Sequence, residues 1–276
     1  MSVGKLQRYG LPFANVVAAG VATNNVTPGR TLEVLQLALG GTSFTKANIS
    51  LFKLKANGRT LIEATGSELD KINAYRGVAT NAAFLDIPFF DEKMFGSLDR
   101  SVTAFDTSNG VSNITTEVTI AGATAPTLKA IVVESAAQKD QTGNAAPYAG
   151  LVGKLLRYPF SMANGGTLPV TVPFGKDSGA IIKRLHVVHT GNMTGATVKQ
   201  DGMVVHESLA AENANMQVRS GRVPQANMYT IDFVPDGNIR NALDTRDAKS
   251  LEWLLSFSAA DNGTILVEYL DTLGNL

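Results

Sequence analysis

The sequence predicts an all-β protein made of two tandem eight-stranded jelly-roll β-sandwiches, a double jelly roll with short helical excursions. Three observations favour this fold. Short runs rich in Thr, Val and Ile alternate with Gly, Asn and Asp along the 276 residues, which include 26 Gly. Helical periodicity is sparse. The order of elements in the first half recurs in the second, and each half holds roughly seven or eight short strands, as a jelly roll does.

Strands are expected wherever an apolar, β-branched run lies between turn residues. In the first half these runs occupy residues 31–39, 47–55, 60–64, 82–90, 113–121 and 129–134. In the second half they occupy residues 168–172, 180–189, 196–200, 203–206, 228–234, 250–258 and 264–269. Asn57-Gly58 and Asp201-Gly202 each lie between two such runs, and both dipeptides tolerate the positive φ of a tight hairpin turn.

Two short helices are expected at matching places. Residues 67–73 begin a helix with Ser67 as its N-cap, because a serine hydroxyl accepts from free backbone amides and early acidic residues favour a helix N-terminus. Residues 209–218 form the counterpart in the second half.

Matching segments recur in the same order in the two halves. The compared pairs are residues 8–15 with 157–164, 31–35 with 181–185, 57–58 with 201–202, 84–87 with 229–233, 98–100 with 243–246, and 131–134 with 265–268. Agreement in order at all of these places is not expected by chance. We therefore predict an N-terminal jelly roll over residues 1–135, a small, polar linker over residues 136–150, and a C-terminal jelly roll over residues 151–276.

The composition excludes several classes of protein. Lys and Arg number 24 and so do Asp and Glu, so there is no basic surplus for phosphates and no sequence-specific nucleic acid is expected as a partner. Without cysteine, the chain has no disulfide, thiolate zinc site or thiol nucleophile. The N-terminus lacks the apolar core of a signal peptide, and we expect synthesis in the cytoplasm. Charged residues make up only 17%, which fits flanks buried against neighbours.

No set of residues typical of catalysis or cofactor binding occurs, so we predict no enzyme and assign no catalytic or cofactor-binding residue. His186 and His189 lie three residues apart in one expected strand and so face opposite sides, although His206 in a nearby hairpin could approach one of them. A jelly-roll metalloenzyme of the cupin type would need a His-x-His pair with a following Glu, and that pattern is missing. Isolated histidines are more often structural than ligating.

Four aspartates flank the repeated aromatic strand, namely Asp86, Asp91, Asp232 and Asp236. Clustered carboxylates bind calcium in many proteins, but no twelve-residue calcium loop is present. Capping of turns through nearby backbone amides is the simpler role. The sequence therefore leaves the metal ligands unknown.

Trp253, the only tryptophan, shares one face of an alternating strand with Leu255 and Phe257. This pattern predicts core packing, and a carbohydrate-stacking platform is the alternative. Near the N-terminus, Lys5, Arg8 and Tyr9 are candidates for contacts with phospholipid headgroups or with a neighbouring subunit, provided that many copies act together.

The double repeat, the segment Tyr229-Thr230-Ile231-Asp232-Phe233 and the closing residues 265–269 resemble the major capsid proteins of corticovirus-type bacteriophages, which are tailless icosahedral phages with an internal membrane. The resemblance implies a trimeric double jelly-roll capsomer in the capsid shell of a virion, made in the host bacterial cytoplasm. Implied partners are further copies of the chain, neighbouring capsomers, vertex penton and membrane proteins, and the lipid surface. Calcium is associated with virion stability in that family, but no calcium ligand carries over to this sequence.

Two jelly rolls side by side in one chain have a geometric consequence. Three such chains around a threefold axis give six similar towers and a near-hexagonal tile. This geometry indicates a tile for a closed shell. Together with what the resemblance implies, including the internal lipid membrane, it leads us to predict a structural major capsid protein whose pseudo-hexameric homotrimeric capsomers tile an icosahedral shell over that membrane. The alternative is a tandem jelly-roll glycan- or receptor-binding module of the spike or lectin kind.

Overall fold

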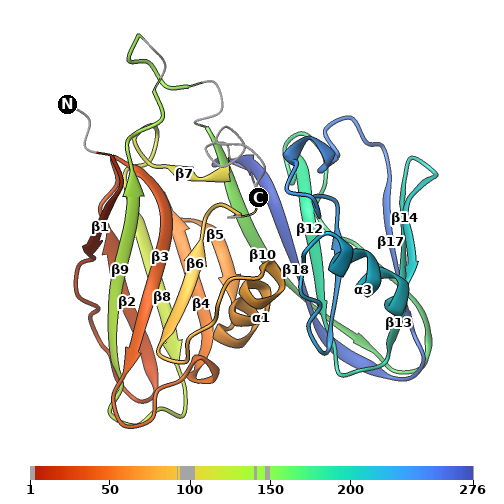
Figure 1. Cartoon of the computed structure of the whole chain (residues 1–276), viewed down its shortest axis with the longest axis horizontal. Helices are drawn as coiled ribbons and strands as arrows, with labels where there is room; N and C mark the ends of the chain where they lie inside the picture. Colours follow the sequence, from red (N-terminus) through yellow and green to blue (C-terminus); the bar gives the residue numbers. More distant parts are fainter. Residues whose placement is uncertain (1–3, 92, 94–102, 140–141, 147–149, 276) are drawn as a thin grey trace.

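The computed structural model describes residues 4–91, 93, 103–139, 142–146 and 150–275. Two β-sandwiches stand side by side along the long axis of the molecule, with the N-terminal half on the left of Figure 1 and the C-terminal half on the right. The repeat comparison that involves residues 98–100 lies outside the described residues. Helices are few, and the predicted all-β class is confirmed.

The first sandwich contains the strands and helices of the N-terminal half. They are β1 (Leu6–Tyr9), β2 (Gly20–Val26), β3 (Thr31–Gly40), η1 (Lys46–Asn48), β4 (Ile49–Ala56), β5 (Arg59–Ala64), α1 (Gly66–Arg76), β6 (Phe84–Pro88), β7 (Phe105–Asp106), β8 (Ile114–Ile120) and β9 (Thr127–Ser135). One sheet has the order β1-β9-β3-β6, with β7 also paired to β3. The facing sheet has the order β5-β4-β8-β2.

The second sandwich contains the elements of the C-terminal half. They are β10 (Leu151–Met162), β11 (Gly166–Val170), β12 (Ile181–Val188), β13 (Met193–Gln200), β14 (Met203–Leu209), α3 (Ala210–Arg219), β15 (Met228–Asp232), η2 (Ile239–Asn241), β16 (Leu243–Asp244), β17 (Leu251–Phe257) and β18 (Asp261–Thr272). One sheet has the order β10-β18-β12-β15, with β16 also paired to β12, and the other has the order β11-β17-β13-β14.

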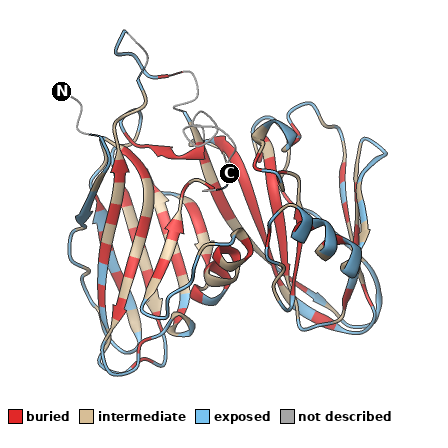
Figure 2. Ribbon diagram, viewed as in Figure 1, coloured by how far each residue is buried: buried red, intermediate tan, exposed pale blue. Residues whose placement is uncertain are grey.

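The two sandwiches have the same connectivity. Adding nine to every strand number of the first sandwich reproduces the pairing order of the second, including the short strands β7 and β16. Each sandwich has its own apolar interior, one containing Phe52 and Val132 and the other containing Trp253 and Val267. Figure 2 shows buried residues alternating with less buried ones along most strands, whereas β12 and β18 are buried almost throughout. The predicted duplication of a jelly roll is confirmed.

The predicted hairpins form at the expected residues. Asn57 and Gly58 have φ of 50° and 78° between β4 and β5, and Asp201 and Gly202 have φ of 51° and 81° between β13 and β14. Positive φ at both central residues is the geometry that two-residue hairpins require.

The predicted N-cap of the first helix is wrong. The N-cap of α1 is Thr65, whose hydroxyl accepts from the backbone amide of Glu68 at 3.1 Å, while the Glu68 carboxylate accepts from the backbone amide of Thr65 at 2.7 Å. This reciprocal capping box outweighs the single hydrogen bond that Ser67 could accept.

Several strands were not predicted. β1 and β2 are edge strands with polar sequences, β7 and β16 have two residues each, and β10 pairs with β18 over twelve residues. The free edge of β10 also meets β5 in parallel orientation, with Leu155 opposite Ile62. One nine-stranded sheet therefore passes from the first sandwich into the second. Within the described residues, no helix has the length and apolar character needed to cross a bilayer.

Candidate functional site at the junction of the two sandwiches

Helix α1 of the first sandwich lies against the outer face of the β10-β18-β12-β15 sheet of the second (Figure 1). Tyr75 donates its hydroxyl to the Asp232 carboxylate on β15 at 2.8 Å, and its ring meets the edge of the His186 ring on β12 at 5.6 Å. Leu266 of β18 packs into the apolar interior of the first sandwich. The junction is therefore continuous with the apolar interior of the first sandwich.

Charged side chains from both sandwiches meet at this junction. They form what we call the junction cluster, which consists of Arg76, Asp91, Lys183, Arg184, Arg222, Asp232 and Glu268. Arg184 lies at its centre and is fully buried. Its guanidinium nitrogens lie 2.6 Å from Asp91, 2.9 Å from Asp232 and 3.1 Å from Glu268. Three carboxylates around one buried cation satisfy the condition for burying charge, because each charge has a partner.

A second buried arginine completes the arrangement. Arg222, just beyond α3, contacts Asp91 at 3.1 Å and donates to the backbone oxygen of Val234 at 3.1 Å. Arg76, at the end of α1, donates to Glu268 at 2.7 Å. Because Asp91 and Arg76 belong to the first sandwich and their partners to the second, the cluster fastens one sandwich to the other.

The cluster shifts the acid strength of its members. Burial alone would raise the pKa of Asp91, but the neighbouring guanidiniums of Arg184, Arg76 and Arg222 outweigh burial and lower that pKa to about 2. Burial likewise opposes ionisation of Glu268, yet Arg76 and Arg184 hold its pKa well below the ordinary value. Both carboxylates are ionised at neutral pH.

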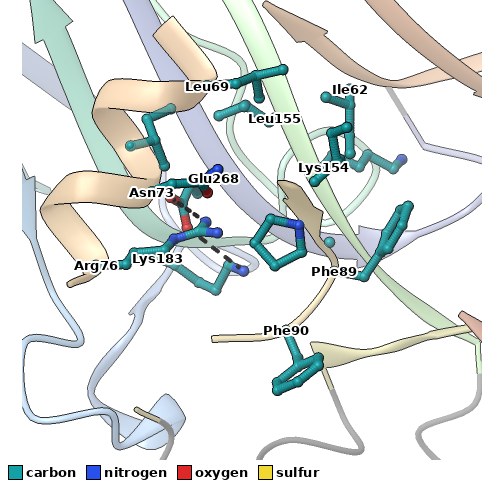
Figure 3. A pocket seen from close by; sticks show the side chains of 14 residues that line it. Ile62, Leu69, Asn73, Arg76, Phe89, Phe90, Lys154, Leu155, Lys183 and Glu268 are labelled. Carbon is teal, nitrogen blue, oxygen red and sulfur yellow. Dashed lines mark hydrogen bonds and ion pairs between the residues drawn. The ribbon is translucent and has the colours of Figure 1, made fainter. Parts of the chain in front are cut away.

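Lys183 has the opposite shift. Burial lowers its pKa to about 8, against the attraction of Glu268, whose carboxylate lies 3.8 Å from the ammonium. The side chains of Arg76, Lys183 and Glu268 point toward one another in Figure 3, at the wall of a cavity of about 40 Å³. That volume holds only a few water molecules. The cavity is too small for a substrate, and the junction is structural.

The three histidines are held separately. His186 lies within the junction, 2.9 Å from both Thr230 Oγ1 and Glu268 Oε1, and burial lowers its pKa, so it is neutral. His189 lies elsewhere, with its Nδ1 atom 3.9 Å from the Asp261 carboxylate. His206 lies with its Nε2 atom 3.3 Å from the Tyr229 hydroxyl. Among the described residues, no group of three or more His, Cys, Asp or Glu side chains could hold a metal ion.

The four candidate aspartates do not form one site. Asp91 and Asp232 come together, but arginines lie between them, and each also caps a turn through the backbone amide two residues later, as predicted. Asp236 caps a turn in the same way. Asp86 accepts instead from the Gln36 amide at 2.6 Å. In the described part of the chain, these aspartates do not gather into a group that could hold a metal ion.

Comparison with known proteins decides the family. The model of the viral coat protein P2 N-terminal domain matches residues 8–134, and that of the viral coat protein P2 C-terminal domain matches residues 152–273. The chain belongs to the viral coat protein P2 family. As a P2 coat protein it is a structural component of a viral capsid and not an enzyme.

Solved structures show the same fold. The major capsid protein P2 from bacteriophage PM2 has a TM-score of 0.84 and 20% identity, with 97% of each chain covered. The STIV major capsid protein has a TM-score of 0.72 and 15% identity, again with 97% of each chain covered. The PBCV-1 virus capsid has a TM-score of 0.62 and 11% identity, covering 98% of this chain and 94% of the other. No curated protein sequence matches the chain.

In this P2 coat protein, Trp253 is a core residue. It is 1% exposed and packs edge-on against Phe233, with ring centroids 6.2 Å apart. The prediction of core packing is confirmed. A buried indole offers no platform on which a sugar could stack, so the observation that favoured a glycan-binding module is gone.

The basic residues near the N-terminus of the coat protein are paired within the chain. Lys5 contacts Glu33 at 3.0 Å, and Arg8 contacts the buried carboxylate of Glu134 at 2.9 Å. Tyr9, by contrast, is 75% exposed. At this surface the exposed group is therefore the Tyr9 ring, whereas the Lys5 and Arg8 cations are paired with carboxylates of the same chain.

The central residues of the junction cluster were not predicted from sequence. Lys183 and Arg184 stand inside an apolar run, between Ile182 and Leu185. Lys and Arg are almost never fully buried unless they are paired, so two cations in a core strand signal a buried ion pair. That signal locates Arg184 but not its acidic partners, which come from three other segments.

Proposed function

We propose that three copies of this capsid protein assemble into a pseudo-hexameric homotrimer, and that these capsomers tile an icosahedral shell. One observation carries the proposal: the two sandwiches of equal connectivity meet through unlike faces. The first contributes the edge of β5 and helix α1, and the second contributes the edge of β10 and the outer face of its sheet. A contact between unlike faces of similar units generates a closed ring when it is repeated around an axis.

The mass of the purified protein tests the trimer. We expect sedimentation equilibrium to give three times the 29.1 kDa chain at micromolar concentration. Electron micrographs of particles should show capsomers with six towers and threefold symmetry. A chain that remains monomeric at every salt and calcium concentration, with no particle in infected cells or after expression, would overturn the proposal.

An internal lipid membrane beneath the shell is a further part of the proposal, as are vertex and membrane proteins as partners and synthesis in the host bacterial cytoplasm. The likeness to corticovirus-type capsid proteins supports it. Purified particles should contain phospholipid, and detergent should remove that lipid while capsomers remain trimeric. Particles that contain protein and DNA but no phospholipid would contradict the membrane.

The domain boundaries and the calcium remain proposals as well. A division into residues 1–135, 136–150 and 151–276 is supported by the two family matches, which end at residue 134 and resume at residue 152. A structural calcium ion has no assigned ligands. Comparing the melting temperature of whole particles and of isolated capsomers, each with calcium and with a chelator, tests for it.

A further inference from the structure

Helices α1 and α3 hold equivalent positions in the two sandwiches. Asn73 of α1 donates its side-chain amide to the backbone oxygen of Asp86 on β6 at 2.7 Å. Gln217 of α3 donates to the backbone oxygen of Thr230 on β15, also at 2.7 Å. Strands β6 and β15 are themselves equivalent, so both helices lie over the same part of their sandwich.

Only one of the two helices is covered. Tyr75 of α1 is fully buried against the second sandwich, whereas Met216 and Val218 of α3 are 57% and 59% exposed. Figure 2 shows α3 mostly in the colour of exposed residues and α1 largely buried. Helix α3 therefore presents to solvent the kind of surface that α1 uses at the junction.

The surface that receives α1 also has a second copy. The outer face of the β1-β9-β3-β6 sheet carries an open hollow of about 290 Å³. Its apolar wall, which we call the outer hollow, consists of Val34, Val78, Pro88, Phe90, Ile131 and Val133, and the remaining lining residues are polar, namely Lys5, Gln7, Gln36 and Asp86. This sheet is equivalent to the one on which α1 packs.

Backbone pairing fixes which residues correspond. Val34 lies opposite Val133 in the first sandwich, and Arg184 lies opposite Glu268 in the second, each pair directly after the bulge in its strand. The outer hollow therefore occupies the place that the junction cluster occupies in the second sandwich. Apolar side chains replace the charges there.

Val78 confirms this correspondence independently. Its backbone amide donates to the oxygen of Asn73 after α1, as the amide of Arg222 donates to the oxygen of Gln217 after α3. Val78 thus stands where the second sandwich has an arginine of the cluster.

Two strand edges complete the comparison. β5 and β10 pair with each other at the junction. In the described sheets, their equivalents β14 and β1 are end strands with one neighbour each, β13 and β9. The chain therefore carries both halves of a second junction, at opposite ends of its long axis (Figure 1).

We propose that α3 and the part of β14 around His206, the equivalent of Ile62 on β5, dock on the outer hollow and β1 of a second copy, in the way that α1 and Ile62 dock on the second sandwich within the chain. The proposal rests on the trimer and names its contact surfaces. Continuity with the junction identifies the occupant as another copy of this chain, because the docking helix and its receiving face exist already in one polypeptide.

The equivalences assign the contacts. Met216 takes the place of Ile72 and enters the outer hollow. Arg219 takes the place of Tyr75, whose partners Asp232 and His186 correspond to Pro88 and Gln36. The Asp86 carboxylate, which accepts from the Gln36 amide, lies next to this position and is the acidic group for the longer Arg219 side chain. The contact thus pairs an apolar side chain with the apolar wall and a cation with a carboxylate.

One further contact accounts for an exposed aromatic group. Within the chain, Arg157 on β10 lies 3.3 Å from Glu68 on α1. The corresponding residues of the second junction are Tyr9 on β1 and Glu212 on α3. Tyr9, which is 75% exposed in one chain, becomes covered and reaches the Glu212 carboxylate of the other copy.

Cysteine cross-linking tests the proposal directly, because the natural chain has no cysteine. A chain with Met216→Cys and Ile131→Cys carries one thiol on α3 and the other on β9. These elements lie in different sandwiches, with β9 on the far side of the first (Figure 1), so a disulfide can form only between copies. Mild oxidation should give covalent dimers and trimers on a non-reducing gel. The matched control combines Met203→Cys with Ile131→Cys. Met203 is the equivalent of Arg59, which stays exposed beside the junction within the chain. Position 203 should likewise stay outside the second junction, and the control should form no cross-link.

A charge at the centre of the contact gives the second test. Met216→Glu should weaken trimer association at least about tenfold in sedimentation, while Met203→Glu should leave it unchanged. Both methionines are exposed in one chain, so each variant should keep the circular dichroism spectrum and melting temperature of a folded chain.

The outcomes separate this inference from the proposed function. Trimers that persist in Met216→Glu and yield no cross-link would overturn the inference and leave the trimer standing on another surface. A natural chain that never trimerises would overturn both. Loss of trimer in Met216→Glu, together with cross-linking through position 216 and not through position 203, would establish the contact.

Discussion

The Arg184 guanidinium lies 2.6 Å from the Asp91 carboxylate, although the two residues belong to different sandwiches. Both are buried, and Asp91 also contacts Arg222. An ion pair in this position fixes how the sandwiches stand against each other, since moving them apart would separate the buried Asp91 carboxylate from both Arg184 and Arg222.

We expect Arg184→Met to lower the free energy of unfolding by about 3–5 kcal/mol, because it removes the central cation that three buried carboxylates share. Arg246→Met is the matched control. Arg246 pairs with Asp244 at the surface, where such a pair contributes about 0–1 kcal/mol. Urea unfolding of both variants measures the difference, and equal losses would show that the junction cluster does not hold the sandwiches together.

Acid should destabilise the protein through the same cluster. The pKa of Asp91 is about 2 in the folded chain against 3.8 ordinarily, so its stabilising contribution is present above about pH 4 and disappears as the pH falls through about 2. The lowered pKa values of Glu268 and His186 act in the same direction. Asp91 alone accounts for roughly 2 kcal/mol.

Asp91→Asn tests the acid prediction. It should be less stable than the natural chain at about pH 7 and should lose less stability on acidification to about pH 3. Chemical unfolding at the two pH values measures both quantities. An unchanged dependence on pH would rule out Asp91 as a source of acid sensitivity.

The two sandwiches should unfold together. β5 and β10 share one sheet, and the junction cluster is buried between the halves, so neither half can open without exposing the other. Trp253 reports on the second sandwich alone, whereas far-ultraviolet circular dichroism reports on both. The two signals should give the same denaturant midpoint, and a fluorescence midpoint clearly below the dichroism midpoint would refute the coupling.

Gly263 on β18 cannot carry a side chain without moving the backbone. A Cβ there would lie 1.9 Å from the carbonyl oxygen of Val188, well inside contact distance. We expect Gly263→Ala to cost about 1–3 kcal/mol in thermal or urea unfolding. Gly274→Ala, where a Cβ meets none of the described atoms within 4 Å, should change stability by less than about 0.5 kcal/mol.

Much of the fold could be predicted from the sequence because local signals agreed with the final structure. Asn57-Gly58 and Asp201-Gly202 occupy backbone angles that few other dipeptides tolerate, and they place two equivalent hairpins. The Thr65 cap was missed although Thr65-Gly66-Ser67-Glu68 contains the spacing of a capping box. The sequence therefore contains the signal for Thr65 as the N-cap, and the capping-box spacing to Glu68 is stronger evidence than the presence of Ser67 alone.

Identical residue types in the two halves are a less reliable guide to equivalent positions than the order of the strands. Glu134 and Glu268 match in sequence, yet Glu134 lies opposite the core residue Leu32, while Glu268 lies opposite Arg184 on the outer face. A shift of one residue in a strand moves a side chain to the other side of the sheet. The charged partners at the junction depend on this choice of face, which only the paired structure determines.

Strands β5 and β10 share one sheet, so the described parts of the two sandwiches are joined by strand pairing as well as by buried charges. We therefore expect a shell built from this protein to bend at the contacts between chains more readily than within a chain. Substitutions on the outer flanks should then change the diameter of the particles more than substitutions at the junction do.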